Sequence, residues 1–308
     1  MDVMVVFMQM VQLFSLMAVG YLLYCLKIFD KSFNKKLTAF LLSVTMPSMI
    51  VVSILSQEKV QKIEDIIFAF VLGVIIYLLL PVIGYVIAKI VKVPQEQVGL
   101  YMFMNMFSNV GFMGYPVMNA IYGPSAIFYT SIFNMIFNLF LYSTGRSVMR
   151  FGYHENEKIN MKNFINPGIV ASLIAIVFYF AGLRLPTLVL STLDMLGDMT
   201  TPLAMMIIGS TLATIPLKDV FNERSAYAFA LVKQVIFPVI AFPILNILIK
   251  DSLLLGVALI MISMPVGNSA VLFATQYGGD EAVAAKNIFM TTLISVITIP
   301  LIVALYLI

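Results

Sequence analysis

The chain has 308 residues, of which 61% are hydrophobic and 11% charged, with a formal net charge of +3 and a mean hydropathy of +1.03. This composition excludes an ordinary soluble domain and predicts a protein with many membrane spans, whose main partner is the lipid bilayer. The small, dispersed net charge excludes nucleic-acid binding, and the single cysteine excludes an intrachain disulfide and a cysteine-rich metal site.

Apolar stretches separated by charged or turn-rich segments follow one another along the chain. About 20 apolar residues are enough for a helix to cross the hydrocarbon core of a bilayer. The sequence therefore predicts an all-α polytopic membrane protein with ten transmembrane helices, at residues 4–25, 37–56, 66–89, 97–122, 124–145, 165–183, 187–212, 226–249, 253–276 and 281–307. The first stretch lacks the basic leader and the small-residue cleavage site of a signal peptide, and we expect it to be retained.

Basic residues are distributed unequally between the two sides of this arrangement. Twelve of the 18 Lys and Arg residues fall on one side and four on the other, while Lys233 and Lys286 lie within predicted spans. Because cytoplasmic loops carry an excess of Lys and Arg, we expect a multi-pass protein of the cell membrane with both termini outside. Lys286 is near the start of the tenth span and is expected to snorkel to the membrane surface.

Two of the predicted spans are interrupted near their middle. The fourth contains Ser-Asn-Val-Gly-Phe-Met-Gly-Tyr-Pro at residues 108–116, and the ninth contains Met-Pro-Val-Gly-Asn-Ser at residues 264–269. Each break lies about 12 residues from the point where the chain enters the membrane, which is roughly 18 Å along a helix and close to the midplane. Backbone groups freed there must bond to protein, water or ligand, and a matched pair of breaks is typical of a transporter binding site.

The second half of the chain repeats short motifs of the first half at a nearly constant offset of 155 to 157 residues. The matched segments are 45–47 with 200–202, Gly99 with Gly256, 110–111 with 266–267, and 120–123 with 275–278. This offset predicts a duplication, with a first five-helix repeat at residues 1–145, a cytoplasmic linker at 146–164 and a second five-helix repeat at 165–308. Because five is odd, the second repeat would enter the membrane from the opposite side.

The segment Asn109-Val110-Gly111-Phe112-Met113-Gly114-Tyr115-Pro116, the five-plus-five layout and the Pro265 break resemble the auxin efflux carrier family. That family includes plant PIN-type carriers and bacterial permeases for malate, malonate and related acids. The resemblance covers the whole chain and implies two inverted repeats, broken helices that cross, and a transport part that moves organic anions past a scaffold part by an elevator-like motion. It is also the only ground for expecting a homodimer. The long cytoplasmic loop of many plant members is absent, which favours a compact bacterial-type carrier.

Residues at the two breaks are the candidate substrate-binding residues. Glycine and proline loosen or interrupt a helix, and amides and hydroxyls can donate to a carboxylate beside the positive end of a half-helix. These candidates are Asn109, Gly111, Gly114, Pro116, Pro265, Gly267, Asn268 and Ser269. The alternative is that the glycines and prolines only kink packed membrane helices.

Four other polar residues within predicted spans are candidates for coupling or gating. Asp198 lies roughly 16 Å along the seventh span, where its charge requires protonation, a partner or hydration. Thr200 and Thr201 precede Pro202, which frees backbone carbonyls that could ligate a cation or join a proton relay. Lys233, in the eighth span, would either pair with an acid or snorkel. A structural, hydrogen-bonded acid is the alternative for Asp198.

Together these features predict a secondary active transporter of small organic anions, either mono- or dicarboxylates, with the elevator-type alternating access that the resemblance implies. We expect coupling to protons or sodium ions and no other cofactor or metal. The chain has no Walker A sequence, which argues against nucleotide-driven transport.

Three other functions remain as alternatives. The first is an intramembrane sensor or receptor for a similar anion, which the short loops and the lack of an attached domain disfavour. A channel is less compatible with breaks at the midplane than a carrier is. An enzyme is not expected, because the spans show no Ser/His, paired-Asp or His-Glu-x-x-His constellation.

Overall fold

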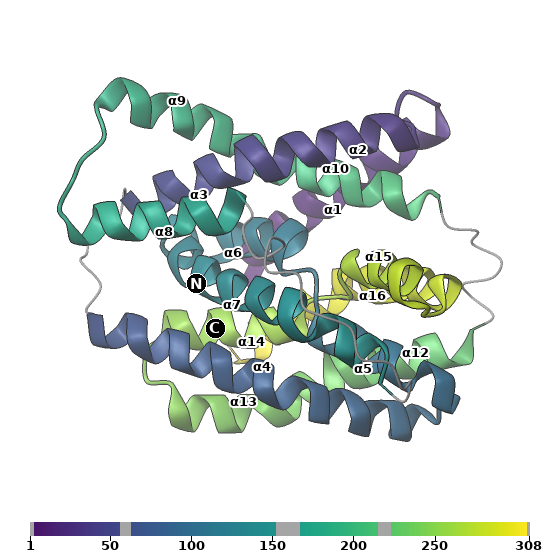
Figure 1. Ribbon diagram of the computed structural model, residues 1–308. Helices are drawn as coiled ribbons and strands as arrows, with labels where there is room; N and C mark the ends of the chain where they lie inside the picture. Colours follow the sequence, from purple (N-terminus) through teal and green to yellow (C-terminus); the bar gives the residue numbers. More distant parts are fainter. Residues whose placement is uncertain (1–2, 56–62, 152–166, 215–222, 307–308) are drawn as a thin grey trace.

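The computed structural model describes residues 3–55, 63–151, 167–214 and 223–306, and these residues are almost entirely helical (Figure 1). No strand occurs among them apart from an isolated bridge between Ser108 and Val266. In chain order the helices are α1 (Val3–Cys25), α2 (Lys31–Phe40), α3 (Met46–Leu55), α4 (Ile63–Val91), α5 (Val98–Met106), α6 (Tyr115–Tyr122), α7 (Pro124–Met149), α8 (Pro167–Phe180), α9 (Thr187–Asp198), α10 (Thr200–Leu212), α12 (Arg224–Leu231), α13 (Phe237–Leu248), α14 (Ser252–Ser263), α15 (Ser269–Tyr277) and α16 (Glu281–Tyr306).

Within the described part of the chain, five helical stretches are long and apolar enough to cross a membrane. They are Lys31–Leu55, Ile63–Val91, Pro124–Met149, Arg224–Leu248 and Glu281–Tyr306. Shorter apolar helices occupy Val11–Cys25, Pro167–Phe180 and Ser252–Ser263. The chain is therefore a helical protein with several apolar spans, as a multi-pass membrane protein requires, while the number of ten spans stays a prediction.

Three helical stretches contain one wider, π-helical turn, and each such turn ends two residues before a proline. The turns are Leu41–Thr45, Val110–Gly114 and Val232–Ile236, and the prolines are Pro47, Pro116 and Pro238. A proline lacks the N–H of the helical ladder and crowds the carbonyl four residues before it, so the ladder widens ahead of it. The prolines thus decide where these helices deform, and one deformation lies within the first predicted break.

The helices form two groups, one above the other in Figure 1. The upper group contains α1, α2, α3, α8, α9 and α10, in which α1 packs on α10 and α3 packs on α8 and α9. The lower group contains α4, α5, α7 and α12 to α16, and α6 packs on α7 between the groups. Both interrupted stretches therefore place their breaks in the lower group, close to the boundary between the groups.

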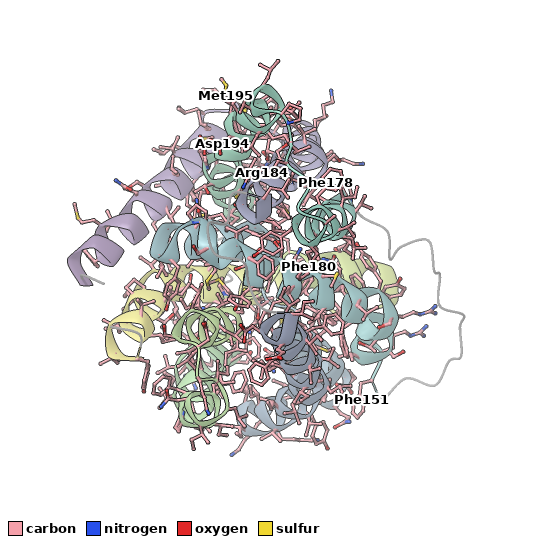
Figure 2. All side chains as sticks on the ribbon, turned by 90° about the vertical axis from the view of Figure 1, so that its left-hand side faces the viewer. Phe151, Phe178, Phe180, Arg184, Asp194 and Met195 are labelled. Atoms are coloured by element: carbon pink, nitrogen blue, oxygen red, sulfur yellow. The ribbon has the colours of Figure 1, made fainter. Side chains whose placement is uncertain are left out.

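Large apolar side chains cover much of the outer surface of both groups. Strongly exposed examples are Val82 on α4, Val177 on α8, Met195 on α9, Ile247 on α13 and Leu305 on α16. Figure 2 shows Met195 at the outer edge of the upper group. An apolar exterior of this extent is unfavourable in water and suits a hydrocarbon solvent.

The predicted linker at residues 146–164 can be followed only at its beginning. Its first four residues continue α7 to Met149, because the helical pattern does not stop at the predicted boundary. Residues 152–164 of the predicted linker lie outside the described residues.

Candidate functional site

The two breaks lie against each other and are joined by backbone hydrogen bonds. The amide of Asn109 donates to the carbonyl of Pro265 at 2.8 Å, and the amide of Gly267 donates to the carbonyl of Phe107 at 3.1 Å. These bonds flank the antiparallel bridge between Ser108 and Val266. Main-chain groups that each helix loses by breaking are therefore bonded by the other break, as a buried backbone requires.

Local sequence explains where the second break begins and why it can approach the first. Met264 has φ −59° and ψ 147°, an extended conformation that the following Pro265 favours. A Cβ atom at Gly267 would lie 3.0 Å from the carbonyl oxygen of Phe107 and 3.1 Å from that of Ser108. A side chain at position 267 would therefore push the two backbones apart by a few tenths of an ångström, and glycine allows them to come this close.

A cavity of about 530 Å³ lies at this crossing, between the upper and lower groups. Five of the eight predicted substrate-binding residues line it: Asn109, Gly111, Gly267, Asn268 and Ser269. The other three, Gly114, Pro116 and Pro265, are buried and are not part of the described lining. We call this space the amide-lined cavity.

The lining of the amide-lined cavity is uncharged in the described part of the chain. Its polar side chains are those of Thr38, Ser108, Asn109, Asn134, Asn138, Tyr142, Thr211, Asn268, Ser269 and Tyr277. Ser269 Oγ is buried and has no hydrogen-bond partner among the described residues, and the side chain of Asn268 does not cap α15. The Ser269 hydroxyl and the Asn268 amide remain available to donate hydrogen bonds to a solute, while Leu42, Phe112 and Leu272 supply apolar surface.

Lys233 is bonded directly to the first break. Its side chain is fully buried, and Nζ donates to Ser108 Oγ at 2.7 Å and to the backbone carbonyl of Asn105 at 3.3 Å. Among the described residues no carboxylate pairs with it. Lys233 therefore adopts neither of the two arrangements expected from the sequence, since it is neither paired with an acid nor extended to the surface.

A different set of groups holds the second break. The amide of Val266 donates to Thr291 Oγ1 at 3.1 Å, and Gln234 Nε2 donates to the carbonyl of Thr291 at 2.9 Å. Sequence reasoning did not select Ser108 or Thr291 as site residues. A serine inside the first broken motif was the available signal for Ser108, whereas Thr291 lies in an apolar span without any local signal.

A second cavity, of about 630 Å³, lies at the other end of α3 and α10. Asp194, Asp198 and Thr201 line it together with Asn119 and Ser191, and we call it the aspartate-lined cavity. Figure 2, which views the molecule from the end where α9 begins, shows Asp194 and Arg184 on the near side of the upper group. Asp198 is exposed to this space, so its charge is open to hydration.

The four candidate coupling residues do not form one cluster. Asp198 and Thr201 line the aspartate-lined cavity. Thr200 is buried, and its hydroxyl has no partner among the described residues. Lys233 instead contacts Ser108, a residue of the amide-lined cavity.

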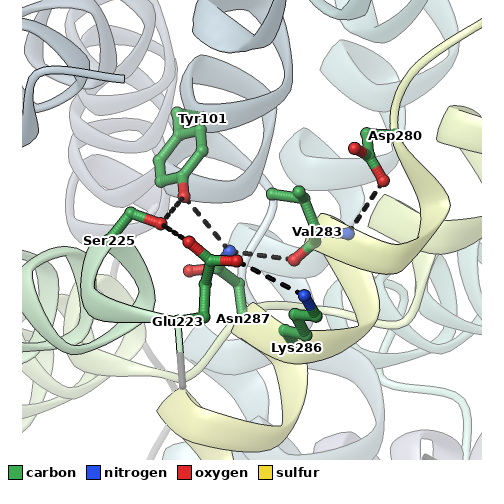
Figure 3. A network of polar contacts seen from close by, with 7 residues as sticks. All are labelled: Tyr101, Glu223, Ser225, Asp280, Val283, Lys286 and Asn287. Carbon is green, nitrogen blue, oxygen red and sulfur yellow. Dashed lines mark hydrogen bonds and ion pairs between the residues drawn. The ribbon is translucent and has the colours of Figure 1, made fainter. Parts of the chain in front are cut away.

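A further polar network joins the start of α12 to α5 and α16 (Figure 3). Lys286 Nζ lies 3.3 Å from Glu223 Oε2, and Ser225 Oγ donates to Glu223 Oε1 at 2.7 Å. Tyr101 donates its hydroxyl proton to Ser225 Oγ at 3.2 Å. Lys286 was expected to extend alone to the membrane surface, but a partly exposed carboxylate holds its ammonium group.

Comparison with known proteins identifies the group to which the chain belongs. The family described as "Membrane transport protein" matches residues 5–158 and 153–303, which together cover nearly the whole chain. The chain belongs to the membrane transport protein family. The resemblance to the auxin efflux carriers that the Asn109–Pro116 segment indicated is confirmed.

Relatives of this membrane transport protein are also named as transporters. An uncharacterized transporter of Methanocaldococcus jannaschii is 26% identical over 93% of this chain and 94% of its own length. An uncharacterized transporter of Methanothermobacter thermautotrophicus is 26% identical over 93% of each chain. A Rhizobium meliloti protein named "Putative malonate transporter" is 22% identical over 93% of this chain and 91% of its own. Transport across a membrane is therefore the function of the family, and the roles of individual residues at the two cavities stay predictions.

Proposed function

We propose that this membrane transport protein is a secondary active transporter of small organic anions, namely mono- or dicarboxylates. The observation that carries the proposal is the amide-lined cavity, where two broken helices meet at the boundary of two helix groups. Transporter binding sites characteristically lie at such paired breaks. The family supports transport, and the name of the Rhizobium relative supports a carboxylate as the solute.

The chemistry of the amide-lined cavity suits a carboxylate. Asparagine amides and serine hydroxyls donate hydrogen bonds, and bonds to an ionised acceptor are stronger than bonds between neutral groups. The N-terminus of α15 begins at Ser269 in the cavity wall and adds the positive end of a helix dipole. A volume of about 530 Å³ is ample for a small dicarboxylate with some water.

Elevator-type alternating access is the transport mechanism that we propose. Both cavities lie between helix groups and use opposite parts of α3: Met46 lines the amide-lined cavity, and Met49, Val52 and Ser53 line the aspartate-lined cavity. Movement of the lower group along the upper group would carry the two breaks from one cavity toward the other. The upper group would then be the scaffold and the lower group the transport part.

The inverted repeat is a further element of the proposal, and element spacing supports it. Lys31–Leu55 and the stretch from α9 to α10 begin 156 residues apart (187 minus 31), and α7 and α16 begin 157 residues apart (281 minus 124). Packing corresponds as well, because α1 packs on α10 while α8 packs on α3. Ten spans with both termini outside the cell membrane complete this topology, and only the family resemblance supports a homodimer.

Coupling to a proton or sodium gradient would drive the cycle. Asp198, Thr201 and the nearby Thr200 are the proposed coupling group, since two carboxylates and hydroxyl oxygens border the aspartate-lined cavity. Lys233, the fourth coupling or gating candidate, is proposed to act at the first break, where it contacts Ser108. No other cofactor is proposed.

Uptake into proteoliposomes tests the proposal. Purified protein in liposomes should accumulate labelled malonate, malate or a monocarboxylate when a proton or sodium gradient is imposed. Asn109→Ala and Asn268→Ala should impair this uptake, whereas Asn246→Ala, at an exposed position on α13, serves as a matched control. Carboxylate binding without any flux would favour the sensor alternative, and absence of both binding and flux would reject the proposal.

A further inference from the structure

Lys233 is unusual because it combines full burial with uncharged partners. Its Nζ donates to a serine hydroxyl and a backbone carbonyl, and no carboxylate among the described residues is bonded to it. An ammonium group removed from water is unfavourable unless an opposite charge compensates it. The two observed hydrogen bonds use only two N–H groups, which a neutral amine also has.

Charged groups on neighbouring elements do not supply this compensation. The turn Val232–Ile236 packs on α12, α13, α14 and α16, and Lys233 also touches α5. The charged and titratable side chains on these five helices are those of Tyr101, Arg224, Tyr227, Glu281, Lys286 and Tyr306. Lys286 is paired with Glu223, and Tyr101 is bonded to Ser225, so both are engaged elsewhere.

Ser108 connects the buried lysine to the amide-lined cavity. Its Oγ accepts from Lys233 Nζ at 2.7 Å, and Ser108 also lines the cavity. Because that oxygen already accepts a hydrogen bond from Lys233, its own proton is free to point toward another acceptor. A solute oxygen in the cavity is such an acceptor, and a cationic Lys233 would polarise the hydroxyl and strengthen that bond.

We propose that the anion and a proton on Lys233 bind jointly, with Ser108 transmitting the positive charge to the anion. The inference rests on the proposed function and deepens it, because it assigns the counter-charge of the substrate to one residue. With the cavity empty, Lys233 is a neutral amine held by Ser108 and Asn105. When a carboxylate enters, the amine takes up one proton from solvent and becomes ammonium, and the carboxylate accepts the hydrogen bond of Ser108. Release of the anion returns the proton.

Calorimetric titration of the purified full-length protein with malonate tests this linkage. Malonate is fully ionised between about pH 7 and pH 9, so the substrate itself contributes no proton change. Measurements in buffers of different ionisation enthalpy should show uptake of up to one proton per malonate. Affinity should fall up to about tenfold for each unit by which the pH rises through the titration of Lys233.

Three variants separate the role of Lys233 from those of Ser108 and of another lysine within a predicted span. Lys233→Met should bind malonate about tenfold or more weakly and show no linked proton uptake. Ser108→Ala should weaken binding but keep a pH dependence, because the amine remains. Lys286→Met is the matched control, since it removes the other lysine within a predicted span and should retain the linkage. If Lys233→Met does not fold, Lys233→Gln replaces it, with thermal unfolding as the check.

The outcomes distinguish this inference from the proposed function. Malonate binding without proton uptake, or with uptake unchanged in the Lys233 variant, overturns the inference and leaves the proposed function standing. Absence of malonate, malate and monocarboxylate binding in the wild-type protein overturns both.

Discussion

The two helix breaks use the same backbone arrangement but different side-chain support. At both, a main-chain amide donates to a carbonyl of the other break. The first break is then held by the amino group of Lys233, through Ser108, and the second by the hydroxyl of Thr291. The two breaks thus share one backbone arrangement but differ in chemistry, since among the described residues a group that can carry a charge is bonded to the first break and not to the second.

Under the proposed function, the position of the bound solute and the selection of an anion therefore depend on different residues. Backbone pairing at the crossing sets the position of the proposed solute site, and it depends on small residues and prolines in both halves. The charge that is proposed to favour an anion comes from Lys233, in the second half of the chain. Substitutions at equivalent places in the two halves should therefore have unequal consequences.

The largest effect is expected at the backbone contact itself. Gly267→Ala places a Cβ atom 3.0 Å from the carbonyl oxygen of Phe107, so the two breaks must separate. We expect a loss of stability of about 1–3 kcal/mol and loss of malonate uptake, measured by thermal unfolding in detergent and by liposome flux. Gly111→Ala is the control for thermal unfolding alone, because Gly111 lines the amide-lined cavity and the nearest neighbour of its added Cβ atom would be Met46 Cε at 3.9 Å. Equal thermal unfolding of the two variants would refute the importance of this contact.

The next effect concerns the amides on the two sides of the cavity. Asn109→Ala and Asn268→Ala should each weaken malonate binding by about tenfold or more, because a hydrogen bond to an ionised group contributes about 1.5–3 kcal/mol. Thermal unfolding should change little. Calorimetry on the purified variants measures the affinity. Wild-type affinity in both would remove the crossing from the substrate site.

Loss of the hydroxyl that supports the second break should lower the stability of the protein more than its affinity for malonate. Thr291→Val removes the hydroxyl that accepts from the Val266 amide and leaves a buried donor unpaired, at a cost of about 1–3 kcal/mol. Thr292→Val is a matched control, since the buried hydroxyl of Thr292 has no partner among the described residues. Thermal unfolding of the two variants compares them directly. A larger loss of malonate affinity than of stability in Thr291→Val would contradict the assigned difference between the breaks.

The smallest effect on anion affinity is expected at the aspartate-lined cavity. Asp198→Asn removes a charge that borders this cavity and leaves the breaks intact. Malonate affinity should stay within about twofold of wild type, while the sodium or pH dependence of uptake changes or disappears. Asp194→Asn, one helical turn earlier, is the comparison. An unaltered sodium and pH profile in Asp198→Asn would exclude its coupling role.

Local sequence was sufficient to locate both breaks but not the contacts that support them. Glycine, asparagine and proline at residues 109–116 and 264–269 act on their own helices, so their effect is visible in the sequence. The bond from Lys233 to Ser108 joins residues 125 positions apart and depends on the turn Val232–Ile236 lying against the end of α5. No local pattern encodes that distance.

The sequence also did not predict which residues of the first break face the amide-lined cavity. Gly111 lines the amide-lined cavity, whereas Gly114 and Pro116 are buried outside its described lining. The π-helical turn Val110–Gly114 changes the angle between successive residues, so an ideal helical wheel assigns the wrong face. Asp198 shows a similar limit: α9 ends at this residue, and a depth calculated from one continuous helix does not apply.

At two glycines, the crossing of α1 with α10 has no room for a methyl group. A Cβ atom at Gly20 would collide with the carbonyl oxygen of Met206, and one at Gly209 with that of Met17. Main chain therefore touches main chain at these points, and no deformable side chain lies between them. This makes the pair mechanically stiff, because bending or sliding of one helix must displace the other. Within the upper group, α1 and α10 are therefore expected to move as one unit.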